Sequence, residues 1–126
     1  MDDRRIRISA GPVSIEARLN DSRSAAAIWD ALPLRATAET WGDEIYFDIG
    51  LMLAAESPKA VVEPGDLGYW PPGRAFCIFF GPTPASQRDE IRPASPVNVV
   101  GQVVGDPRVF TKVRAGTTIT LERGSA

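Results

Sequence analysis

The residue types best suited to binding a ligand are gathered between positions 69 and 80. This run, YWPPGRAFCIFF, contains five of the ten aromatic side chains, together with two prolines and Arg74. Tyrosine, tryptophan and arginine dominate binding hot spots because they combine a large apolar area with polar groups. The same run is also expected if the rings fill the core of a barrel and the prolines stiffen a turn, so both interpretations stay open. The Trp70–Pro71 bond is in addition a candidate for cis geometry, which occurs at about 5% of X-Pro bonds, mostly in tight turns.

A second group of chemically active residues is a cluster of carboxylates, Glu39, Asp43, Glu44 and Asp48. On a strand, Glu44 and Asp48 would share a face, because residues an even number apart point the same way. Such a pair is able to bind a hard cation or to act as acid and base. Exposed carboxylates are nevertheless the rule in proteins, so we expect a solvated strand face or turn here.

The composition excludes several kinds of chemistry. The chain has no histidine and one cysteine, which excludes a histidine-dependent triad, an internal disulfide and a cysteine-rich zinc site. Cys77 lies in an apolar run, so we expect a buried thiol of the core. The glycines do not follow the spacing of a phosphate-binding loop. We therefore expect no cofactor and no metal.

The charge and hydropathy of the chain argue against nucleic-acid and membrane partners. Lysine and arginine number 14 against 16 acidic residues, a formal net charge of -2, so we expect no nucleic-acid binding. The N-terminal residues are polar, which argues against a signal peptide, and no stretch approaches the about 18 apolar residues of a membrane span. We expect a cytoplasmic protein without membrane contact, folded as a single domain over residues 1–126.

Alternation of apolar and polar residues predicts a mainly β fold around these sites. One helix is expected over residues 24–32, capped by residues 20–22 and stopped by Pro33. The run at 75–80 is apolar on both faces, so a strand there must be buried on both sides. Together, the patterns predict seven or eight strands, the clearest of them at 5–8, 13–19, 34–40, 45–49, 97–103 and 117–121.

Two segments carry a specific resemblance: WGDEIYF at 41–47 and GDLGYWPPGRAFCIFFGPTP at 65–84. In these segments, and over nearly its whole length, the chain resembles a family of small bacterial and archaeal cyclophilin-like proteins of uncharacterised function. The resemblance implies a closed cyclophilin-like β-barrel of about eight strands with one capping helix. The family is linked to true cyclophilins by fold, and activity does not follow from fold.

True prolyl isomerases carry the motifs F-H-R-I-I-P-G-F-x-x-Q-G-G-D and W-L-D-G-x-H-V-V-F-G-x-V. The region at 34–43 offers Arg35 but lacks the glutamine, and the region at 97–103 lacks both the tryptophan and the histidine. An apolar pocket with one arginine donating to the prolyl nitrogen would still lower the isomerisation barrier, which is ~18–20 kcal/mol for an ordinary peptide bond. Arg35 or Arg74 is available for that role.

We therefore expect a binding module that holds a peptide or a small ligand in a cleft lined by aromatic residues and prolines. A weak or degenerate peptidyl-prolyl cis-trans isomerase is the alternative. A homodimer is compatible with either, and predicts a two-fold contact burying more than about 1,000 Å². The residues expected to contact the ligand are Arg35, Trp41, Tyr46, Tyr69, Trp70, Arg74, Phe76 and Phe79.

Overall fold

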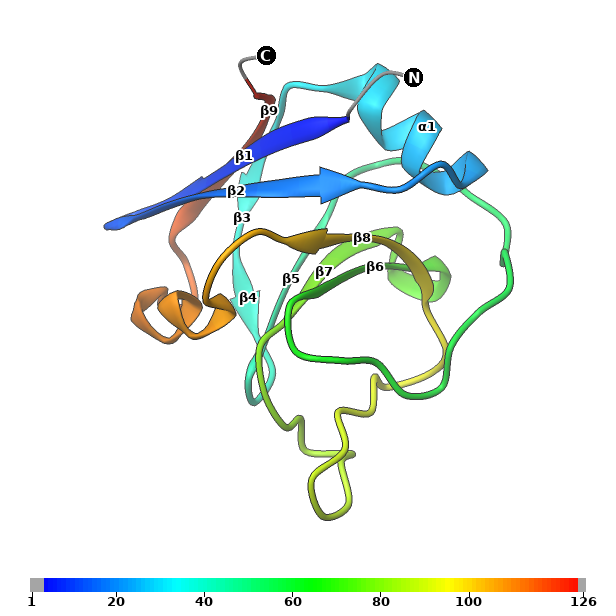
Figure 1. Cartoon of the computed structure of the whole chain (residues 1–126), viewed down its shortest axis with the longest axis vertical. Coiled ribbons are helices and arrows are strands. Elements are labelled where there is room, and N and C mark those ends of the chain that lie inside the picture. The colour runs from blue at the N-terminus through cyan, green and yellow to red at the C-terminus, as the bar shows by residue number, and fades with distance from the viewer. Residues whose placement is uncertain (1–3, 125–126) are drawn as a thin grey trace.

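The computed structural model describes residues 4–124, which form one sheet of nine strands, one α-helix and two short 3-10 helices. The strands follow the order β3-β9-β1-β2-β8-β6-β7-β5-β4, and every pair is antiparallel (Figure 1). The elements are β1 (Arg5–Ala10), β2 (Val13–Leu19), α1 (Arg23–Ala31), β3 (Leu34–Thr37), β4 (Glu39–Thr40), β5 (Glu44–Asp48), β6 (Asp66–Trp70), η1 (Pro71–Gly73), β7 (Ala75–Phe79), β8 (Asn98–Val103), η2 (Pro107–Lys112) and β9 (Thr118–Arg123).

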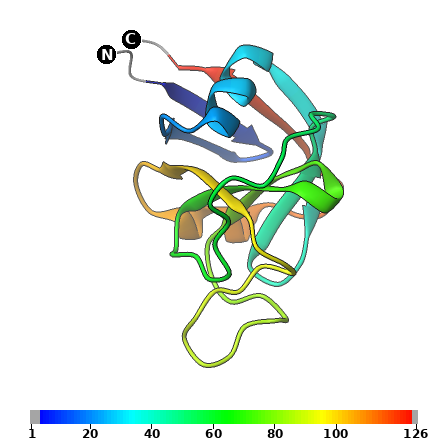
Figure 2. The same cartoon turned by 90° about the vertical axis from the view of Figure 1, so that its right-hand side faces the viewer.

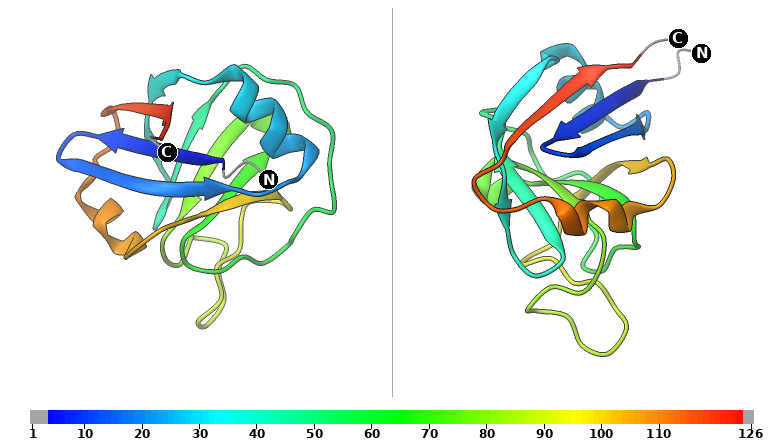
Figure 3. Two further views of the ribbon diagram at one scale, coloured as in Figure 1. Left: turned by 45° about the horizontal axis from the view of Figure 1, so that its top comes forward. Right: turned by 90° about the vertical axis from the view of Figure 1, so that its left-hand side faces the viewer.

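The two outermost strands of this sheet are consecutive pieces of the chain, separated only by Ala38. β3 pairs with β9, whereas β4 pairs with β5 at the other end of the strand order. The Ala38 N–H donates to the carbonyl of Thr117 at 2.8 Å, and its carbonyl accepts from Gly116 at 2.8 Å. The bend at Ala38 therefore brings the sheet round into a nearly closed barrel (Figure 3), and the predicted mainly β, cyclophilin-like fold is confirmed. If β3 and β4 are counted as one bent strand, the barrel has eight strands.

Two apolar clusters lie on opposite sides of the barrel wall. The larger fills the barrel interior with the inward-pointing side chains of every long strand, such as Ile8, Leu67 and Phe76. The smaller lies outside, against β5, β6 and β7, and contains Cys77 and Phe79. This explains why β7 is apolar on both faces: one face points into the barrel, and the other is covered by the long segment 80–97 between β7 and β8. That segment projects from the end of the barrel opposite to α1 (Figures 1 and 2).

β6 is the strand that the sequence patterns do not predict. Gly68 within it, Gly65 just before it and two prolines just after it are typical of a turn, yet residues 66–70 pair with both β7 and β8. A Cβ atom at Gly68 would lie 3.1 Å from both Phe79 and Val97 side-chain atoms. The glycine is therefore a packing requirement inside a strand rather than a turn signal.

The helix α1 begins and ends close to the predicted positions. The Ser22 hydroxyl accepts from the Ala25 N–H at 3.1 Å, and the Glu56 carboxylate accepts from the N–H groups of Arg23 and Ser24 at 3.0 and 2.9 Å. These bonds to the carboxylate lower the pKa of Glu56. Neither α1 nor the 3-10 helices of residues 4–124 has the length and apolar character needed to cross a membrane.

Replacement of the capping residue tests this helix start. We expect Ser22→Ala to lower the free energy of unfolding by about 1 kcal/mol, because the Ala25 N–H loses its acceptor. The Glu56 carboxylate continues to serve the first turn, so the loss stays modest. Urea denaturation at neutral pH measures the change, and a loss as large as that of a core truncation would contradict the local role.

The cis geometry predicted for Trp70–Pro71 is wrong. The cis peptide bond within the described residues is Leu32–Pro33, at the end of α1. Pro71 instead begins the 3-10 helix η1, where a trans bond and the fixed φ of proline suit the first helical position. Arg74 ends η1 in the left-handed region with φ 49°.

Candidate functional site

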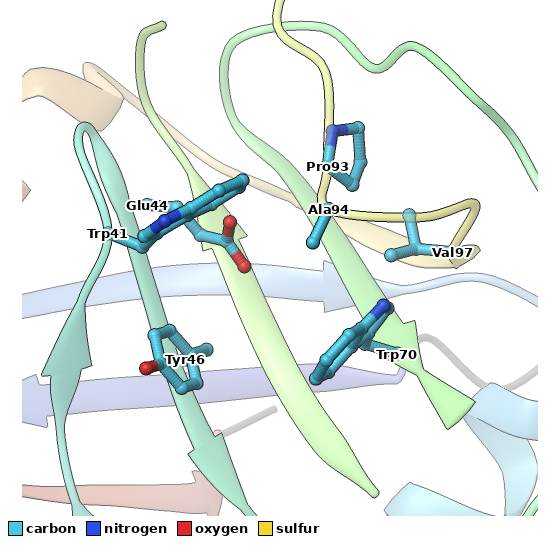
Figure 4. Close-up of a pocket in the computed structure, with 7 residues that line it drawn as sticks. All are labelled: Trp41, Glu44, Tyr46, Trp70, Pro93, Ala94 and Val97. Carbon is cyan, nitrogen blue, oxygen red and sulfur yellow. The ribbon is translucent and has the colours of Figure 1, made fainter. Parts of the chain in front are cut away.

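A pocket of about 250 Å³ opens on the outer face of the barrel, above β5, β6 and β7 (Figure 4). Three of its walls are aromatic, one residue is a carboxylic acid, and the remaining side comes from the segment that leads into β8. The lining residues are Trp41, Glu44, Tyr46, Trp70, Pro93, Ala94 and Val97. The apolar character of this lining is typical of ligand pockets, in which a few polar groups set the orientation of the ligand.

Trp41 is held by a tight turn between β4 and β5. The backbone N–H of Trp41 donates to the backbone carbonyl of Glu44 at 2.9 Å, and Gly42 occupies the left-handed region with φ 61°. A Cβ atom at Gly42 would lie 2.9 Å from the carbonyl oxygen of Pro82, while the Asp43 N–H donates to that oxygen at 2.9 Å. The turn is thus packed against the segment after β7, which fixes the backbone that carries the Trp41 side chain.

Trp70 forms the opposite wall and is fixed at both ends of its ring system. A Cβ atom at Gly73 would lie 2.7 Å from the six-membered ring of Trp70, so only a glycine lets the ring rest on η1. The indole N–H of Trp70 donates to the Ser95 hydroxyl at 2.6 Å. This bond ties the Trp70 wall to the segment that supplies Pro93 and Ala94.

Glu44 lies at the base of the pocket with only 6% of its surface exposed. Figure 4 shows its carboxylate pointing between the rings of Trp41 and Trp70. Burial raises the pKa of Glu44 to about 7, although the nearby Cys77 thiol acts in the opposite direction. The expected solvated position is wrong for Glu44, because the segment 80–97 covers this end of β5. It holds for Asp48 at the other end, whose side chain is 59% exposed.

Cys77 is buried and free, as expected. Burial raises the pKa of its thiol well above the ordinary value, and the nearby Glu44 carboxylate raises it further. A thiol in this environment stays protonated and is a poor nucleophile. Its role here is to fill space beneath the pocket, and it donates a hydrogen bond to the Ala75 carbonyl, with 3.9 Å between sulfur and oxygen.

A second hollow of about 380 Å³ adjoins the pocket and shares Tyr46 and Trp70 with it. The two rings therefore stand between two neighbouring hollows on the barrel surface. At the edge of the second hollow, Arg74 forms an ion pair with Asp48 at 3.8 Å, and both side chains are about half exposed. The other residues lining this hollow are Ala36, Thr37, Glu39, Phe47, Asp48, Gly73 and Ala75.

Three of the predicted ligand-contacting residues, Trp41, Tyr46 and Trp70, come together in the pocket. The arginines do not join them: Arg35 is exposed on β3, and Arg74 is paired with Asp48.

The other predicted aromatic residues, Tyr69, Phe76 and Phe79, are fully buried. Tyr69 and Phe76 point into the barrel interior, where the Tyr69 hydroxyl donates to the Leu51 carbonyl at 2.5 Å and accepts from the Leu53 N–H at 3.0 Å. Phe79 lies in the outer cluster, against which Tyr46 and Trp70 pack. Strict alternation along β6 and β7 sends neighbouring aromatic residues to opposite faces, so rings adjacent in sequence do not share a site.

Sequence analysis did not identify Pro93, Ala94 or Val97 as site residues. Pro93 and Ala94 belong to a polar, proline-containing segment whose composition is typical of an ordinary surface loop, and Val97 begins the strand predicted at 97–103. The nearest signal is the apolar outer face of β7, which requires that some segment cover it.

The nearly closed barrel with its one α-helix defines a mainly β protein of the cyclophilin-like class. The chain belongs to the cyclophilin-like family, whose model matches residues 4–122. It is also similar to a hypothetical protein from Archaeoglobus fulgidus, whose solution structure superposes with a TM-score of 0.82 at 41% sequence identity. The match covers 97% of this chain and 95% of that one. No functionally curated protein matches the chain.

Proposed function

We propose that the protein binds a peptide or a small ligand in the pocket formed by Trp41, Tyr46 and Trp70. The observation that carries the proposal is that these three aromatic side chains, none of them fully buried, surround a hollow of about 250 Å³. Most of the other aromatic residues are fully buried in the clusters described above. Partly exposed aromatic rings on a rigid backbone act as anchors for a ligand, because little conformational entropy is lost when the ligand packs on them.

The same geometry favours binding over prolyl isomerisation. Isomerisation in such a pocket calls for an N–H donor, such as an arginine, at the prolyl nitrogen, and no arginine is among the residues that line the pocket. Of the two predicted arginines, Arg74 is paired with Asp48 beside the second hollow, and Arg35 is exposed on β3. Isomerase activity is therefore the alternative function, and cis-trans exchange should be measured with any proline-containing peptide that binds.

The protein contains its own control for a binding experiment. Of its three tryptophans, Trp41 and Trp70 line the pocket, whereas Trp29 lies on α1 beneath the Arg123 guanidinium, 4.5 Å from the ring centre. Indole N–H signals are followed by NMR while a panel of proline-containing peptides and small apolar ligands is added. Shifts of the Trp41 and Trp70 signals with an unchanged Trp29 signal support the proposal. Absence of shifts across the panel would overturn it.

Substitution of one wall should separate binding from folding. We expect Trp41→Ala to weaken binding of any ligand found in the panel by about 10- to 100-fold, the usual effect of removing an aromatic anchor. The ring is partly exposed, so the thermal midpoint should change little. Trp29→Ala is the matched control and should leave the affinity unchanged. Equal affinities of Trp41→Ala and the unsubstituted protein would show that the ligand binds elsewhere.

A further inference from the structure

Glu44 is a buried acid in an otherwise apolar pocket. No arginine or lysine of residues 4–124 is found in an ion pair with it, and the nearby Cys77 thiol is neutral. An ionised carboxylate in such a place is costly unless an opposite charge compensates it. A cation that enters the pocket would supply that compensation and stabilise the ionised form of Glu44.

The groups that surround Glu44 do not supply that compensation. Tyr46, on the same strand, contributes a phenol, and Cys77 on β7 contributes a thiol. From the covering segment, Pro93, Ala94 and Val97 carry no charge. Arg92 comes just before them, but its guanidinium is engaged by Glu90 through two bonds of 2.7 and 3.1 Å. Asp43, next to Glu44 in the chain, adds a further negative charge, with its carboxylate beside Gly81.

The aromatic walls are suited to the same kind of ligand. The faces of tryptophan and tyrosine rings attract cations, and this attraction is strongest where water is excluded. Two tryptophans and a tyrosine line the pocket together with one carboxylate, so a cation there would be attracted both by the rings and by the charge of the ionised carboxylate. We propose that the pocket binds a small organic cation, a protonated or methylated amine, with its charged nitrogen beside Glu44 and between Trp41 and Trp70. This inference rests on the proposed binding function and names its ligand class.

A metal ion fits this pocket less well than an organic cation does. Hard metal ions require several oxygen ligands, and Glu44 is the one carboxylate that lines the pocket. Within residues 4–124, no group of three or more acidic or cysteine side chains is placed to hold a metal. The apolar walls instead favour the methyl or methylene groups of an amine.

Binding of such a cation would be coupled to a proton. Because burial raises the pKa of Glu44 to about 7, the carboxyl is partly protonated at neutral pH. A cation favours the ionised form, so the affinity should increase as the pH rises from about 6 to about 8. A neutral ligand of the same shape should show no such increase.

The test compares two ligands of nearly identical shape, choline and 3,3-dimethylbutan-1-ol, which differ by a quaternary nitrogen in place of a carbon. With the indole signals as readout at about pH 8, we expect choline to bind at least about tenfold more tightly. Glu44→Gln should remove most of that preference, whereas Trp29→Ala, a change outside the pocket, should retain it. Binding of the neutral alcohol to Glu44→Gln, whatever its affinity, shows that the pocket of the variant still forms.

The outcomes separate this inference from the proposed function. Equal affinities for the two ligands, or a choline preference that survives in Glu44→Gln, would overturn the cation assignment and leave a neutral binding pocket. Binding of panel peptides without any response to choline, or to a peptide bearing trimethyl-lysine, would do the same. If choline and the trimethyl-lysine peptide both shift Trp41 and Trp70, their relative affinities show whether the natural source is a free amine or a side chain.

Discussion

The free energy of unfolding should fall by about 3 kcal/mol as the pH is raised from about 4.5 to about 8, through the contribution of Glu44 alone. Its pKa is about 7 in the folded protein against 4.5 as the reference for the unfolded chain. Between these two values the folded state holds more protons than the unfolded state, so stability decreases with increasing pH. The contribution is complete below the unfolded value and is lost as the carboxyl ionises through the folded value.

The matched variant is Glu44→Gln, which retains the shape of the side chain without its titration. The difference in unfolding free energy between the two proteins should be small at about pH 4.5 and should favour the variant by about 3 kcal/mol at about pH 8. Glu56, Glu90 and Asp106 have lowered pKa values, so their contributions to stability increase with pH in the acidic range. These contributions are the same in both proteins and cancel in the difference. A difference that does not change with pH would contradict the burial of an ionisable Glu44. Urea denaturation at a series of pH values measures it.

The second large effect is expected at Asn98, the first residue of β8, which is 1% exposed. Its side-chain amide donates to the Ser24 hydroxyl at 3.0 Å and to the Ala54 carbonyl at 2.9 Å, and its oxygen accepts from the Glu56 N–H at 2.8 Å. One side chain therefore joins the barrel, the start of α1 and the segment that crosses between β5 and β6. Asn98→Ala should lower the free energy of unfolding by about 3 kcal/mol, because the buried Ser24 hydroxyl and two partly buried backbone groups of that segment lose a partner together.

Asn20 provides a matched control for Asn98, since it also donates to a backbone carbonyl, that of Val99, at 2.8 Å, but is exposed. Water is able to replace its bonds, so Asn20→Ala should cost about 1 kcal/mol or less. The segment at 50–56 should in addition exchange its amide protons faster in Asn98→Ala than in Asn20→Ala. Similar losses of stability in the two variants would show that burial of the amide does not determine its contribution.

Both predictions concern residues whose importance depends on contacts made far along the chain. Glu44 belongs to a carboxylate cluster that sequence reasoning identified, but its burial depends on a segment some fifty residues further on, of which Pro93 and Val97 line the pocket. Asn98 lies in a predicted strand and shows no local pattern that distinguishes it from a polar residue on a solvated face. In each case, the environment of a polar side chain is set by the tertiary fold.

The sequence by itself determined the mainly β barrel, the limits of α1, the burial of Cys77 and three of the aromatic residues that line the pocket. Alternation, capping residues and a two-sided apolar strand are local patterns, and they reflect local geometry and burial directly. Only the tertiary structure decided that Tyr69 and Phe76 point inward while Trp70 points outward, that the strand at 34–40 bends at Ala38 to close the barrel, and that Glu44 loses its water. Those features depend on strand pairing and on the covering segment 80–97, which join residues distant in the chain and are set by the packing of the whole barrel.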